Sequence, residues 1–320
     1  IVVTDKSKLA GLSEGEIAGL AAAAKKAGKD GYMITLVNTT QQPILSSLEN
    51  RELREQIFKA STNRAAKTNG PIIIEETNLR AQKAELLGFK DWASYVMTSR
   101  MAQTTDNVYG ILDDLAPKAV EKAKAEAAAI QKVINDSGES FELKPWDWAF
   151  YAEKVRAEKY DLDPALVKPY FEMNSVIHDG LFFAMNKLYG ITFKERKDLP
   201  VYHEDVTAYE VFNADGSAIG LFYMDPYARE GKRGGAWMSA YVSQSGLKGT
   251  KPVIYNAQNI PKPAEGEPTL MTFDEVSTMF HEFGHAAHGL FSNVKYPSLA
   301  GTATARDFVE FPSQAHEDWM

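Results

Sequence analysis

Residues 278–288 have the sequence TMFHEFGHAAH, which contains the pattern H-E-x-x-H with histidines at positions 281 and 285. An α-helix advances about 100° and 1.5 Å per residue, so His281 and His285 lie one turn apart on one face, where two imidazoles can bind one metal ion. Glu282 points to the side of that face, where a carboxylate can accept a proton from a metal-bound water without being a ligand. The stretch therefore predicts a metal-binding helix with a general base beside the metal.

The residues around the motif predict the helix that the motif requires. Apolar residues recur at three- and four-residue spacing over residues 273–290. Thr272 and Glu275 form a capping-box pattern, which starts a helix about two turns before His281. Gly284 costs about 1 kcal/mol relative to Ala inside a helix, a loss more readily explained if another group must approach the backbone closely. These features weaken the simpler alternative of a core helix whose two histidines hydrogen-bond to neighbours.

A zinc enzyme usually has a third protein ligand and one open position. His288 is a poor candidate, because it lies about 10 Å beyond His281 along the helix axis. A Gly- and Thr-rich loop at residues 300–304 leads into a second predicted helix that carries four acids: Asp307, Glu310, Glu317 and Asp318. These acids are the candidates for the third ligand.

At this point the sequence resembles a known family. The motif, residues 296–302 (YPSLAGT) and residues 307–314 (DFVEFPSQ) are similar to the thimet oligopeptidase and peptidyl-dipeptidase family of zinc metallopeptidases. The resemblance implies one zinc ion per chain, held by His281, His285 and Glu310, with Glu282 as the catalytic base. Residues 307–314 look most like the bacterial peptidyl-dipeptidases, which implies short peptide substrates and the release of C-terminal dipeptides.

One feature common among relatives is absent. Several members of the family have an acid four residues before the first histidine, and this chain has Ser277 there. Any contact that orients His281 must therefore come from elsewhere in the fold.

The expected fold is mainly α, a zincin-like helical metallopeptidase with a small β-sheet next to the zinc helix. Residues 1–200 are expected to form a helical lobe, of which residues 50–101 also resemble the family's helical lobe. Within it, Gly70 is expected to end one helix and Pro71 to begin the next. Residues 201–320 are expected to hold a β-hairpin region and the zinc-binding helices.

The hairpin is predicted by residues 207–212 and 218–224, which alternate in polarity on either side of a turn at residues 213–217. The edge of such a sheet could hold an extended peptide by main-chain hydrogen bonds. The pair Gly234 and Gly235 could admit substrate to the backbone or simply turn the chain between strands. Lys232 and Arg233 could bind a substrate carboxylate or form structural ion pairs.

Composition restricts the partners. The chain has 320 residues, 44% of them hydrophobic, with a net charge of −8, so nothing favours a nucleic acid as partner. It has no cysteine, which excludes disulfides, Cys-ligated zinc and a thiol nucleophile. No apolar run approaches the roughly 20 residues of a membrane span. The compartment stays open between cytoplasm and periplasm.

The chain stops at Met320, ten residues after Glu310. In the family, a loop well downstream supplies tyrosine and histidine donors, so the resemblance implies that the C-terminal part of the catalytic domain is absent. A separate C-terminal piece of that domain is thus an expected partner besides peptides. The alternative to an enzyme is a non-catalytic peptide-binding or interaction module with a structural or vestigial zinc site.

Overall fold

The computed structural model describes residues 1–36, 42–160, 164–263 and 266–320. About half of the chain is helical, and it forms two compact units. The first comprises Ile1–Thr98 and Ala102–Leu162, and the second comprises Ser99–Met101 and Asp163–Met320. None of the helices within the described ranges combines the length and the apolar character that crossing a membrane requires.

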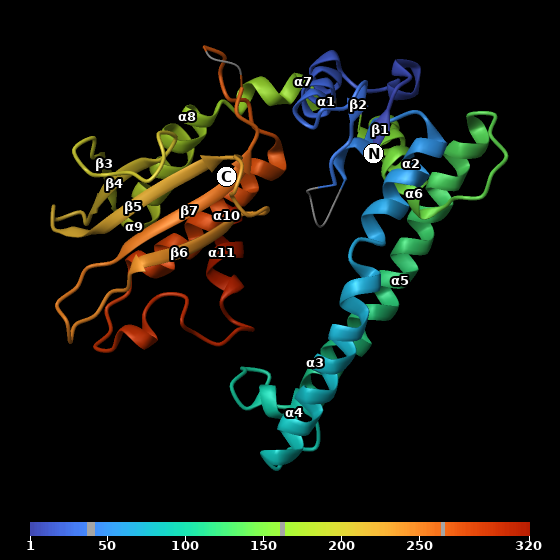
Figure 1. Ribbon diagram of the computed structural model, residues 1–320. Helices are drawn as coiled ribbons and strands as arrows, with labels where there is room; N and C mark the ends of the chain where they lie inside the picture. Colours follow the sequence, from blue (N-terminus) through green and yellow to red (C-terminus); the bar gives the residue numbers. More distant parts are fainter. Residues whose placement is uncertain (37–41, 161–163, 264–265) are drawn as a thin grey trace. The chain divides into compact units, whose positions relative to one another are not determined.

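The first unit is mainly helical (Figure 1). Its elements are β1 (Val2–Val3), α1 (Glu14–Lys26), β2 (Tyr32–Met33), α2 (Arg51–Thr62), α3 (Ala66–Leu86), α4 (Trp92–Met97), α5 (Thr105–Asp136) and α6 (Pro145–Tyr160). Side chains that accept hydrogen bonds from backbone N–H groups start several of these helices: Ser13 caps α1 and Asn50 caps α2.

The predicted helix boundary at Gly70 and Pro71 was wrong. The chain breaks earlier, at Ala65, which has a left-handed backbone with a φ of 54°. Both Gly70 and Pro71 lie inside α3. Pro71 stands in the second turn of that helix, where it removes a single helical hydrogen bond and is tolerated more easily than deeper in a helix.

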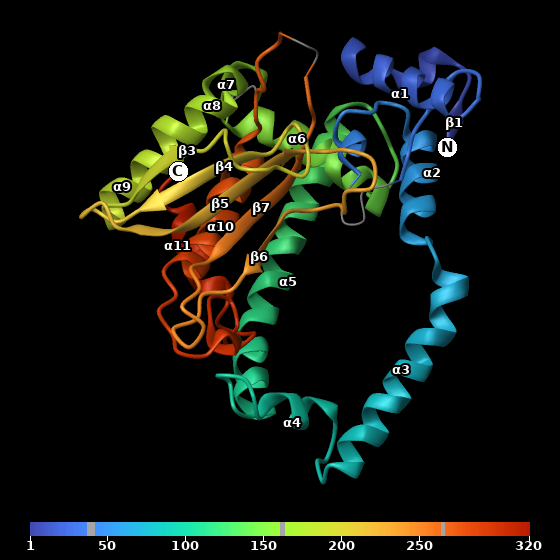
Figure 2. The same ribbon diagram turned by 60° about the vertical axis from the view of Figure 1, so that its left-hand side comes forward.

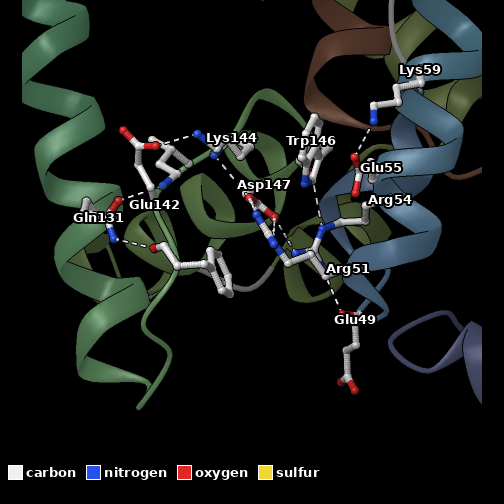
Figure 3. A network of polar contacts seen from close by, with 12 residues as sticks. Glu49, Arg51, Arg54, Glu55, Lys59, Gln131, Glu142, Lys144, Trp146 and Asp147 are labelled. Carbon is white, nitrogen blue, oxygen red and sulfur yellow. Dashed lines mark hydrogen bonds and ion pairs between the residues drawn. The ribbon is translucent and has the colours of Figure 1, made fainter.

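A buried ionic network joins α2 to α6 (Figure 3). Asp147 is fully buried and accepts hydrogen bonds from Arg51 Nη2 at 2.8 Å and from Arg54 Nη2 at 3.1 Å. Arg54, itself 1% exposed, also donates to the carbonyl oxygens of Leu48 and Glu49. Because a buried charge is costly without partners, this network fixes how the two helices meet.

The second unit holds the five-stranded sheet and the helices packed on it (Figures 1 and 2). Its helices are α7 (Pro164–Val167), α8 (Met173–Ser175), α9 (Phe183–Tyr189), α10 (Phe273–Leu290) and α11 (Glu310–Glu317), with a π-helical segment, Val176–Phe182, between α8 and α9. Its strands are β3 (Thr192–Glu195), β4 (Thr207–Phe212), β5 (Ala218–Tyr227), β6 (Trp237–Val242) and β7 (Val253–Ile260).

The sheet has the strand order β3-β4-β5-β7-β6 and is mixed. Strands β4 and β5 form the predicted antiparallel hairpin, whereas β5 and β7 run parallel. Strand β6 pairs with β7 alone in this order and is therefore an edge strand. The prediction of a small sheet beside the motif helix is confirmed, because α10 packs on β5, β6 and β7.

One apolar core spans the second unit. It joins α10, through residues such as Phe280 and Phe283, to Phe222 and Ile254 of the sheet and to the helical residues 173–185. Since those helical residues share the core of the sheet, they belong to the second unit. The boundary expected from the sequence lay later, between residues 200 and 201.

Candidate metal centre

Helix α10 carries three of the four predicted site residues. Its start agrees with the predicted capping box, in which Thr272 Oγ1 accepts a hydrogen bond from Glu275 N at 3.2 Å and Glu275 Oε2 accepts one from Thr272 N at 2.7 Å. The apolar face of α10 is buried in the core, so the opposite face turns its polar side chains away from the sheet. His281 and His285 are half-buried there, whereas Glu282 is only 7% exposed.

Gly284 sets the distance between α10 and α11. A Cβ atom at this position would lie 2.6 Å from Ser313 Cα and 3.1 Å from His316 Nδ1. The close approach that a glycine at this position predicts is thus present, and the approaching group is the backbone of α11. His316 is buried and is held by Pro312 O at 2.6 Å and by Tyr189 Oη at 3.1 Å.

This close packing brings Glu310 to the two histidines. Glu310 Oε2 lies 3.2 Å from His281 Nε2 and 3.0 Å from His285 Nε2. The three ligand atoms all lie within 4.8 Å of one another. A tetrahedral ion with bonds of about 2.0–2.2 Å holds its ligand atoms about 3.3–3.5 Å apart, so this group could hold one metal ion.

Glu317, one of the four acids considered as third ligand, orients His281. Glu317 Oε1 lies 2.6 Å from His281 Nδ1, so an Nδ1–H donates to Glu317 and leaves Nε2 directed at Glu310. Glu317 supplies the contact that Ser277 does not. The signal in the sequence is its spacing from Glu310, because residues seven apart lie on the same face of a helix.

Glu282 has an unusual environment for a carboxylate. Its Oε2 atom is buried and has no hydrogen-bond partner among the described residues. Burial raises the pKa of Glu282 to about 7, an effect that nearby His281 opposes and Glu310 increases. Burial also lowers the pKa values of His285 and His288, which favours neutral imidazoles.

An open cleft of about 490 Å³ gives access to the three clustered residues. Its walls include Trp237 and Met238 at the beginning of the edge strand β6, and Thr302, Thr304 and Arg306 from the loop before α11. His281, Glu282, His285 and Glu310 all line it. The arrangement places a basic carboxylate, three metal-binding groups and a strand edge around one space.

The other residues considered from the sequence have different surroundings. His288 is outside the clustered group, as expected. Asp307 lies outside α11, whose N-cap is Val309 and whose C-cap is Asp318. Lys232 is buried and forms an ion pair with Asp225 at 3.0 Å, whereas Arg233 is exposed.

Two helices thus bring together a histidine pair, an acidic side chain that could be a third ligand and a buried glutamate, a group of the H-E-x-x-H type that could hold a metal ion. Residues 44–320 match peptidase family M3. The chain belongs to peptidase family M3.

The curated relatives include a dipeptidyl carboxypeptidase and an oligopeptidase A. The chain is 49% identical over 324 residues to a dipeptidyl carboxypeptidase of Escherichia coli, an alignment that covers 100% of this chain and 48% of the relative. It is 36% identical over 330 residues to oligopeptidase A of Salmonella typhimurium, covering 99% of this chain and 48% of the relative. The chain therefore spans about half the length of the curated relatives it matches.

Proposed function

We propose that the chain carries the metal centre of a zinc-dependent peptidase that acts on short peptides, with His281, His285 and Glu310 as ligands and Glu282 as general base. The observation that carries this proposal is the convergence of three possible ligand atoms within 4.8 Å beside Glu282, whose buried Oε2 has no hydrogen-bond partner among the described residues. A purely structural metal site needs no such carboxylate, and this argues against the non-catalytic alternative.

The chemistry of the residues follows from their surroundings. When bound, zinc lowers the pKa of water and polarises a carbonyl group. Glu282 accepts the proton of the attacking water and then donates it to the leaving amine. A pKa near 7 suits both transfers, because such a group accepts and releases protons readily at neutral pH. Glu317 holds His281 in the tautomer whose Nε2 faces Glu310.

The edge strand β6 gives a means of holding the substrate. Its free edge offers backbone N–H and C=O groups, and Trp237 and Met238 line the cleft next to the histidines. A peptide added to this edge as an extended strand would bring a carbonyl group close to them. The name dipeptidyl carboxypeptidase of the relative from E. coli leads us to propose that the bond cleaved is the one that releases a C-terminal dipeptide.

The test combines metal content with peptide cleavage on the same samples. We expect about one zinc per wild-type chain by mass spectrometry, weaker retention in Glu310→Ala, and unchanged retention in Glu204→Ala, an exposed acid of the same unit. Glu282→Gln should keep the zinc and lose cleavage. If the wild type retains no zinc after supplementation, the proposal fails. If it retains zinc and cleaves no peptide, the non-catalytic module becomes the better explanation.

A further inference from the structure

Arg306 is a cation on the wall of the cleft whose charge has no partner among the residues that the structure describes. It lies in the loop before α11 and is exposed, and the described residues form no ion pair or hydrogen bond with its side chain. The other ionisable groups on the wall are His281, His285, Glu282 and Glu310. Two of these are acids, so without Arg306 the described lining would repel a carboxylate.

Two other cations of the second unit, Lys232 and Arg229, are committed to contacts inside the fold. Lys232 donates to Asp225 and to the carbonyl oxygen of Tyr227, both within 3.0 Å. Arg229 forms two hydrogen bonds with the same Asp225, at 2.6 and 2.8 Å. Since Asp225 is 2% exposed, these charges are balanced inside the fold. They are not available to a ligand in the cleft.

The position of Arg306 along the chain limits how far it can lie from the metal ligands. Arg306 and Glu310 are four positions apart, so their Cα atoms are at most about 14 Å apart, and the long flexible side chain of Arg306 shortens the remaining distance. Two extended peptide residues span roughly 7 Å. A peptide whose C-terminal carboxylate is bound by Arg306 would therefore end a few residues beyond the metal centre.

We propose that Arg306 binds the free C-terminal carboxylate of a peptide and so makes the cleft select the last residues of the peptide. The inference rests on the proposed function and deepens it, because it identifies the residue that distinguishes a C-terminal segment from the interior of a longer peptide. The planar guanidinium can donate two parallel hydrogen bonds to a carboxylate, and the charge assistance makes such bonds stronger than neutral ones.

Binding of one peptide in two forms tests this. An N-terminally labelled tetrapeptide is prepared as the free acid and as the C-terminal amide, and its affinity for the full chain is measured by fluorescence anisotropy. We expect the wild type to bind the acid about tenfold more tightly than the amide. Arg306→Gln should abolish this ratio by weakening the acid alone, and Arg306→Lys should keep part of it. Lys248→Gln, the loss of an exposed cation elsewhere in the second unit, should keep the full ratio.

Other outcomes overturn the inference. Equal binding of both peptides by the wild type, no measurable binding of the acid, or a preference that survives Arg306→Gln would each do so. Loss of the preference in Lys248→Gln would also overturn it, because the preference would then not depend on Arg306 in particular. Cleavage of the same peptides separates the two proposals: hydrolysis without a preference for the acid refutes only the role of Arg306, whereas a preference without hydrolysis refutes only the peptidase.

Discussion

The close approach of α11 to Gly284 yields a quantitative prediction for Gly284→Ala. The added methyl group would stand 2.6 Å from Ser313 Cα, where carbon atoms normally approach no closer than about 3.5 Å. Helix α11 would have to retreat by about 1 Å. That helix carries both Glu310 and Glu317, so both contacts to the histidines would lengthen together.

The expected effect on metal binding is larger than the effect on folding. Metal–ligand distances tolerate deviations of about 0.2 Å, so a shift of about 1 Å should weaken zinc binding at least tenfold. Overpacking costs about 1–3 kcal/mol, but the better helix propensity of alanine returns up to about 1 kcal/mol. The free energy of unfolding should therefore fall by about 2 kcal/mol or less.

Competition with a chromophoric chelator measures zinc affinity, and denaturant titration measures stability. The control is Gly19→Ala in α1, where an added Cβ meets no atom within 4 Å. That variant should bind zinc like the wild type and gain up to about 1 kcal/mol. If Gly284→Ala also bound zinc normally and unfolded like the wild type, close packing of the two helices would not be what forms the site.

Three further predictions follow from buried or oriented charges. Glu317→Gln should weaken zinc binding about 10- to 100-fold by loosening His281, and normal affinity in the chelator assay would contradict that role. Burial raises the pKa of the Asp147 carboxyl, but hydrogen bonds from two arginines outweigh this and hold the pKa below its ordinary value. Because the folded pKa is lowered, Asp147 stabilises the fold above the unfolded pKa of about 3.9, and this stabilisation is lost as the pH falls through the folded value. Urea unfolding from pH 7 to pH 2 should thus show Asp147→Asn less stable at pH 7 and less sensitive to acid; parallel curves would exclude this linkage. Asp225→Asn should destabilise the second unit by about 3–5 kcal/mol, since it leaves the buried Lys232 without its counterion, and a thermal melt matching the wild type would argue against it.

Predictions that rest on neighbouring residues agree with the structure. The capping box at Thr272 and Glu275 and the hairpin formed by residues 207–224 both depend on contacts within a few residues, and both are present. The boundary at Gly70 and Pro71 failed although it is also local. Helix propensity is a weak preference, and the left-handed Ala65 interrupts the helix before either residue is reached.

Predictions that depend on contacts between residues far apart in the sequence missed part of the structure. Residues 173–185 have the pattern of further lobe helices, yet they pack in the core of the sheet and belong to the second unit. Glu317 stood among four downstream acids, and its seven-residue spacing from Glu310 places both acids on one helical face without showing that this face meets His281. Both outcomes depend on how elements far apart along the chain pack, which hydrophobic periodicity does not specify.

The sequence by itself determined which groups can share one helical face, because the geometry of an α-helix places His281 and His285 one turn apart wherever that helix lies. The tertiary structure decided which acids meet them. Glu310 and Glu317 reach the histidines because α11 packs against the bare backbone at Gly284, and burial of Glu282 beside them raises its pKa. Distances and desolvation of this kind arise only when separate elements pack together.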